Sequence, residues 1–204
     1  MPAIPNTMKL LKVCLALTPL LFAPATSQAA LISYTVNLDG PSESPPNASP
    51  GSGSGTVTFN TTAHTMLVDF SFFGLLGTTT AAHIHAATAV PLTGTAGVAT
   101  TTPTFAGFPL GVTAGTYNNT LDMTQASSYN PSYVTANGGT PASAETALQA
   151  AAAARKSYLN IHTTTFPGGE IRGFLIPVPE PASVSLLAIG AGMGLMRRRR
   201  TRRS

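Results

Sequence analysis

Three histidines and one glutamate are the side chains of this sequence best suited to holding a metal ion. His83 and His85 are separated by one residue, and His162 is followed eight residues later by Glu170. Residues two apart in a β-strand share a face, so one strand would present both His83 and His85 on the same side. Imidazole nitrogens and carboxylate oxygens are ligands for zinc and copper. If Pro167-Gly168-Gly169 closes a hairpin, all four side chains fall on adjacent strands, and they form our candidate metal site.

The same side chains also fit a polar network that holds the strands in register. In that interpretation the histidines bond to Glu170, to Thr163 or to backbone groups, as most buried polar groups do. The hairpin would place His162 opposite Arg172, with the register open to a shift of one residue, and would make Arg172 the partner of Glu170. The sequence favours the polar network because no fourth strong metal ligand is evident. The metal site is kept as the alternative interpretation.

Charge and motifs narrow the classes of function. Residues 31–176 carry six acidic and three basic side chains, so the net charge of +4 comes from the ends of the chain. A basic surface for nucleic acid is therefore not indicated. No serine lies in a Gly-x-Ser-x-Gly nucleophile motif, so we name no catalytic residue and do not expect an enzyme. The remaining histidine, His64, is predicted to lie in a solvated turn.

Short strands are the elements that must position these side chains. Alternation of apolar and polar residues, interrupted by Gly and Pro, is typical of strands and turns. A helix is expected over 141–156, capped by Thr140 or Ser143, and 129–139 is expected to be loop. This pattern predicts a mainly β fold, an antiparallel Greek-key-like β-sandwich or barrel with one late α-helix. The expected strands are 31–38, 56–60, 65–73, 81–86, 115–123, 158–164 and 170–176, with another near 97–101.

The first 29 residues have the order of a secretory signal peptide. Lys9 and Lys12 precede an apolar run over 13–22, and Ser27-Gln28-Ala29 offers the small residues that signal peptidase reads. Cleavage is expected after Ala29. Cys14, the single cysteine of the chain, lies in this leader, so the mature protein would contain no thiol.

The other end of the chain has three parts in a fixed order. Pro179-Glu180-Pro181 precedes the uncharged run 182–196, which is followed by six arginines within 197–203. A helix of this length spans about 22 Å, less than the roughly 30 Å of a bilayer's hydrocarbon core, so it suits a transient membrane segment. The two apolar ends therefore add two terminal hydrophobic helices to the expected fold. Residues 177–204 resemble the PEP-CTERM sorting signal of Gram-negative bacteria, which implies processing by an exosortase and a place at the cell surface or outside the cell.

The central part, residues 30–176, resembles the CHRD domain, a module named from chordin and also found in exported bacterial proteins. Three stretches carry the resemblance: 38–46, 82–86, and a third made of 158–163 followed by 167–175. The resemblance implies a β-sandwich similar to that of copper/zinc superoxide dismutases. Dismutase chemistry does not follow, because a two-metal site of that type needs about six histidines and the chain has four.

Three functions are compatible with these observations. The first is a surface or matrix module that binds an extracellular polysaccharide or a surface protein. The second is a metal-binding module for zinc or copper that uses His83, His85 and His162. The third is an unidentified extracellular enzyme. The sequence names no partner other than signal peptidase and exosortase, which would process the chain.

Overall fold

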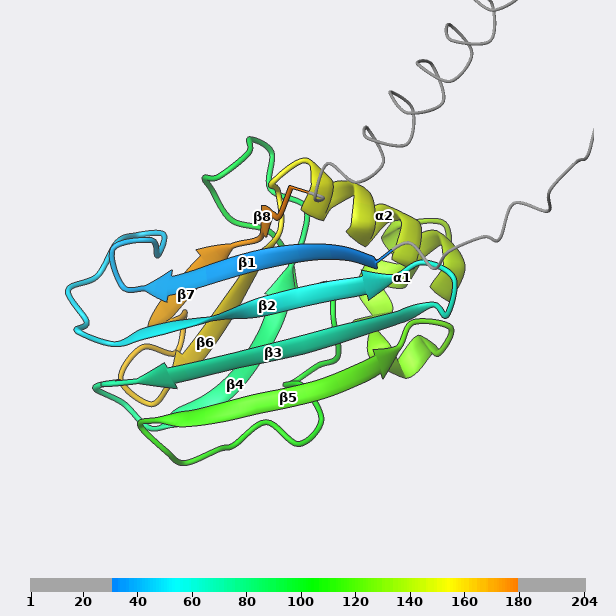
Figure 1. Cartoon of the computed structure of the whole chain (residues 1–204). Helices are drawn as coiled ribbons and strands as arrows, with labels where there is room; N and C mark the ends of the chain where they lie inside the picture. The colour runs from blue at the N-terminus through cyan, green and yellow to red at the C-terminus, as the bar shows by residue number, and fades with distance from the viewer. Residues whose placement is uncertain (1–30, 180–204) are drawn as a thin grey trace, which may run out of the picture.

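One antiparallel sheet dominates the computed structural model, which describes residues 31–179 (Figure 1). Two α-helices and a short 3-10 helix lie between the fifth and sixth strands, at one end of the sheet. In chain order the elements are β1 (Leu31–Asp39), β2 (Ser52–Asn60), β3 (Thr65–Phe73), β4 (Thr79–His85), β5 (Gly115–Asp122), η1 (Ala126–Ser128), α1 (Pro131–Ala136), α2 (Pro141–Ala153), β6 (Tyr158–Thr163), β7 (Ile171–Phe174) and β8 (Ile176–Pro177).

The sheet curves into a half-barrel. Its strand order is β4-β6-β7-β1-β2-β3-β5, with β8 beside β1, and every pair is antiparallel. In Figure 1 the strands β1, β2, β3 and β5 form the front, while β7, β6 and β4 lie behind them. The prediction of a mainly β, antiparallel fold is confirmed at this level. Likeness to superoxide dismutase stays a prediction, and both predicted terminal helices lie outside the described residues.

Apolar side chains at alternate positions of the strands fill the inside of the half-barrel. On β4 the core positions are Ala82 and Ile84, and on β6 they are Leu159 and Ile161, all with no exposed surface. The intervening residues of β4 and β6 therefore point to the outer face. The front strands contribute Tyr34, Val36, Leu38, Val57, Phe59, Met66, Val68, Phe70 and Phe72 to the same core.

The region between β5 and β6 differs from expectation. Residues 129–139 contain α1, because the Asn130 side chain accepts a hydrogen bond from the Ser132 N–H and Pro131 stands at the first helical position. The helix α2 is capped by Thr140, one of the two predicted candidates, but it ends at Ala153 because Arg155 adopts a φ of 58°. Local capping therefore created a second α-helix that the alternation pattern did not reveal.

The strand expected near 97–101 is reduced to isolated bridges, His85 with Val98 and Thr100 with Tyr129. This segment still covers the free edge of β4. Ala99 N–H donates to the Ile84 carbonyl at 2.9 Å, and the Ile84 N–H donates to the Thr100 hydroxyl at 2.9 Å. The edge strand that carries two of the histidines is thus held on both sides. Within 31–179, none of the helices combines the length and apolar character that crossing a bilayer requires.

Candidate metal centre

The pairing of β4 with β6 brings His83, His85 and His162 together on the outer face. His83 lies opposite Asn160. The next pair of residues on the same face is Ala81 and His162. Because Ala82, Ile84 and Ile161 occupy the core side, the three imidazoles project away from the core. The face that the sequence assigned to His83 and His85 is therefore shared with His162.

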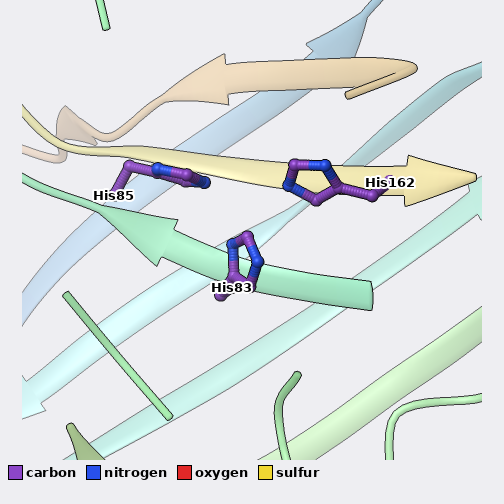
Figure 2. A group of neighbouring side chains, drawn as sticks. All are labelled: His83, His85 and His162. Carbon is purple, nitrogen blue, oxygen red and sulfur yellow. The ribbon is translucent and has the colours of Figure 1, made fainter. Parts of the chain in front are cut away.

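The three rings surround one common space (Figure 2). Ring centroids are 4.7 Å apart for His83 and His85, 4.7 Å for His83 and His162, and 6.0 Å for His85 and His162. One nitrogen from each ring lies within 4.8 Å of the others. A metal ion bound by three imidazoles at about 2 Å needs its nitrogens roughly 3.3–3.5 Å apart, well inside this limit. Side-chain rotations that draw the nitrogens together would form a three-nitrogen site.

Backbone carbonyls set the tautomers of two of these rings. His85 Nδ1 lies 2.8 Å from the Ala96 carbonyl oxygen, and His162 Nδ1 lies 2.8 Å from the Pro167 carbonyl oxygen. A carbonyl only accepts, so each Nδ1 carries the proton and each Nε2 carries a lone pair. Within the described part of the chain, both Nε2 atoms and His83 Nδ1 are buried without a hydrogen-bond partner. Metal-binding histidines usually have this arrangement. One ring nitrogen donates its proton to a carbonyl, which fixes the orientation of the ring, and the other nitrogen is left free to bind the metal.

Burial keeps these imidazoles neutral. It lowers the pKa of His83 to about 3, with further contributions from His85 and His162, and it lowers the pKa of His85 to about 4. Burial also lowers the pKa of His162. A neutral imidazole is the form that binds a metal, so the site needs no deprotonation at neutral pH.

An aromatic and cationic stack supports one side of the cluster. The Tyr158 ring lies parallel to the His85 ring at 4.7 Å, and the Arg172 guanidinium carbon lies 4.7 Å from the centre of the Tyr158 ring. Ala96, whose carbonyl bonds His85, also donates its N–H to the Tyr158 hydroxyl at 3.2 Å. The loop 87–97 is thereby fastened over the histidine face, and it determines how His85 is oriented.

Arg172 and Glu43 form a buried pair beside this stack. Arg172 donates through Nε to the Ser42 carbonyl and through a terminal nitrogen to the Gly94 carbonyl at 2.9 Å. Its Nε lies 3.9 Å from a Glu43 carboxylate oxygen. Burial raises the pKa of Glu43 to about 7, although the Arg172 charge opposes this rise. The predicted pairing of Arg172 with Glu170 is wrong, because Arg172 lies beside Glu43 and both Glu170 oxygens bond other groups. The predicted hairpin register is also wrong, because Asn160, and not His162, lies opposite Arg172, which is a shift of two residues.

Glu170, the fourth residue of the predicted site, lies apart from the histidines. One carboxylate oxygen accepts from the Ser49 hydroxyl at 2.6 Å and from the Leu76 N–H. The other accepts from the Thr163 hydroxyl at 2.6 Å and from the Gly77 N–H at 3.1 Å. Burial alone would raise the pKa of Glu170, but these four hydrogen bonds lower it. With both oxygens occupied, Glu170 does not complete the cluster, which is a correction to the predicted ligand set.

The remaining residues stand as follows. His64 lies in a turn with its side chain 53% exposed, as predicted, and its Nδ1 also contacts a Glu145 carboxylate oxygen at 2.8 Å.

Sequence reasoning missed Tyr158 and Glu43. Tyr158 shares the parity of His162 on β6, which was a usable signal. Glu43 lies in the loop after β1, where no pattern indicated its position. Ala29, Glu180 and Pro181 lie outside the described residues.

Comparison with known proteins agrees with this architecture at the level of family. The CHRD domain family model matches residues 34–175, and the PEP-CTERM protein-sorting motif matches residues 177–200. No curated protein and no solved structure matches the chain. The sorting motif implies an exported protein of a Gram-negative cell envelope that an exosortase processes. The first match covers well over half of the sequence, and the chain therefore belongs to the CHRD domain family and carries a PEP-CTERM sorting motif.

Proposed function

We propose that the CHRD domain of this chain is a metal-binding module, with His83, His85 and His162 as the ligands and zinc or copper as the ion. The observation that carries the proposal is the set of three buried imidazole nitrogens that lack a partner among residues 31–179 and face one space. Three neutral imidazoles on adjacent strands are a donor set that suits both metals.

The unpartnered nitrogens favour this function over a polar network. In a network each buried nitrogen would be bonded, since a buried polar atom without a partner costs about 1–3 kcal/mol. Here the carbonyls of Ala96 and Pro167 bond only the nitrogens that face away from the shared space. An ion at the centre would satisfy all three remaining lone pairs at once.

The proposed place of action is the outside of the cell. Signal peptidase would remove residues 1–29 by cleavage after Ala29, and exosortase would act at Pro179-Glu180-Pro181 within the sorting segment 177–204. The domain 30–176 would then be attached to the surface or released. Binding of an extracellular polysaccharide or a surface protein through the loops stays a prediction, and so does an enzymatic role.

Metal titration of the full-length chain tests the proposal. Calorimetry with Zn(II) and Cu(II), together with metal analysis after dialysis, is expected to give one ion per chain. His83→Ala should abolish binding. His64→Asn is the matched control, because it removes the histidine outside the cluster and asparagine tolerates the positive φ of 52° at that position. Stoichiometric binding that survives His83→Ala, or no binding at all, would contradict the proposal.

A further inference from the structure

We infer that the histidine cluster is selective for a monovalent ion, Cu(I), over Zn(II), and that Arg172 is a specificity-determining residue. This inference rests on the proposed function and goes further by naming the oxidation state of the ion and the residue that sets the preference. It follows from the donor set, the burial of the site and a fixed positive charge beside it.

The donor set contains only neutral imidazoles. Within 31–179 no carboxylate or thiolate belongs to the cluster, and the single cysteine of the chain lies at position 14. Zn(II) is almost always four-coordinate, so at this site it would need a water molecule or an anion as its fourth ligand. Cu(I) is satisfied by three nitrogen ligands in a plane. Three imidazoles that enclose one space match the coordination number of Cu(I) without any addition.

Burial strengthens this preference. His83 and His85 are 6% and 8% exposed, and the three unpartnered nitrogens have almost no contact with solvent. The cost of transferring an ion from water to a buried site is large, and it rises with the square of the ionic charge. No negative side chain in the cluster offsets the second charge of Zn(II). The site therefore penalises a divalent ion far more than a monovalent one.

Arg172 adds a permanent positive charge next to the cluster. Its guanidinium stacks on Tyr158, which stacks on His85, and two backbone carbonyls hold it in place. A Glu43 carboxylate oxygen lies 3.9 Å from the Arg172 Nε and offsets this charge in part. Because the guanidinium is always charged, it repels a divalent ion about twice as strongly as a monovalent one. The Arg172 charge, held against Tyr158, therefore lowers the affinity of the site for Zn(II) more than its affinity for Cu(I).

Competition for metal on the full-length chain tests the inference. Cu(I) would be supplied anaerobically as its bicinchoninate complex, and Zn(II) would be supplied with a chromophoric chelator of known affinity. We expect one Cu(I) per chain, lost in His83→Ala, with an affinity at least 100-fold above that for Zn(II). Arg172→Met removes the charge and keeps an unbranched side chain over Tyr158, and it should narrow the Cu(I)/Zn(II) ratio about tenfold. Arg172→Lys keeps the charge and should preserve the ratio.

The outcomes separate this inference from the proposed function. Zn(II) that binds as tightly as Cu(I) in a His83-dependent manner would overturn the selectivity and leave the metal-binding function standing. Failure of every ion to bind would end both. If Arg172→Met does not fold, the affinity ratio of the unmodified chain still decides selectivity, and Arg172→Gln, a second uncharged variant, decides the role of the charge. If Arg172→Met folds and its ratio of Cu(I) affinity to Zn(II) affinity is unchanged, Arg172 does not determine the specificity.

Discussion

Two polar clusters lie on opposite faces of the strand β6, and they differ in how far their hydrogen bonds are completed. Thr163 points inward and donates to Glu170, whose two oxygens accept four hydrogen bonds. His162, the neighbouring residue, points outward into a cluster with three buried nitrogens that find no partner within 31–179. A completed buried network stabilises a fold, whereas an incomplete one is the place to look for a ligand.

The completed cluster also explains the local architecture around it. Glu170 joins the loop after β1 through Ser49, the β3–β4 connection through Leu76 and Gly77, and the end of β6 through Thr163. The histidines lie on β4 and β6, and their hydrogen bonds reach only the neighbouring loop at Ala96 and the turn at Pro167. We therefore expect removal of Glu170 to affect stability, and removal of a histidine to affect binding.

The largest expected effect is on stability, at Glu170. Glu170→Gln places an amide donor against groups that are themselves donors, and we expect a loss of about 3 kcal/mol in the free energy of unfolding. Urea denaturation measures this loss. The control is Asp69→Asn, an exposed carboxylate on β3, with an expected change within about 0.5 kcal/mol. A loss below 1 kcal/mol at Glu170 would show that the network is less important than its geometry indicates.

Metal should stabilise the chain only through the histidines. When the concentration of the free ion is 100 times the dissociation constant, the free energy of unfolding is expected to rise by about 2.7 kcal/mol. Glu170→Gln should retain this increment, because its side chain lies outside the cluster, and His83→Ala should lose it. If metal still raises the free energy of unfolding of His83→Ala, the ion binds elsewhere, and the histidine cluster does not differ from the Glu170 cluster in the way described.

The metal-free chain should lose stability in mildly acidic solution through His83. Burial lowers its folded pKa from 6.5 to about 3, so the unfolded chain binds more protons between these values and stability falls as pH decreases below 6.5. At pH 5 the expected loss from this group is about 2 kcal/mol. The measurement is urea denaturation at pH 7.5 and pH 5, compared between the unmodified chain and His83→Leu.

The comparison with His83→Leu is needed because Glu43 acts in the opposite direction. Burial raises its folded pKa from 4.5 to about 7, so the folded state holds the proton more tightly and stability increases as pH falls through this window. Both chains retain Glu43, and the difference between them isolates the histidine. Equal pH dependence in the two chains would mean that His83 is not buried as a neutral imidazole.

The smallest expected effect is that of His83→Leu on the metal-free chain at pH 7.5. Replacing an unpartnered buried polar group by an apolar one of similar size should change the free energy of unfolding by at most about 1 kcal/mol, with stabilisation as the expected sign. Urea denaturation without metal measures it. Destabilisation by 3 kcal/mol or more would indicate that His83 belongs to a structural network after all.

Part of the candidate site could be predicted because strand parity is a local property. The spacing of His83 and His85 placed both on one face, and His162 was expected on an adjacent strand. The pairing of β4 with β6 confirms both expectations. The assignment of Glu170 failed for a different reason. The shift of two residues in the β6–β7 pairing and the contacts of Glu170 with Ser49 and the β3–β4 connection involve segments that are distant in sequence.

The sequence by itself determined the alternating apolar faces, a helix that begins near residue 140, the C-terminal sorting motif and the resemblance to the CHRD family. These depend on residue types at short spacing, where backbone geometry acts alone. Only the tertiary structure decided which nitrogens stay free, since the Ala96 and Pro167 carbonyls that bond the other nitrogens come from loops. It also decided that Arg172 stands beside the histidines with Glu43. Long loops have no periodicity to read, and their positions follow from packing against the whole sheet.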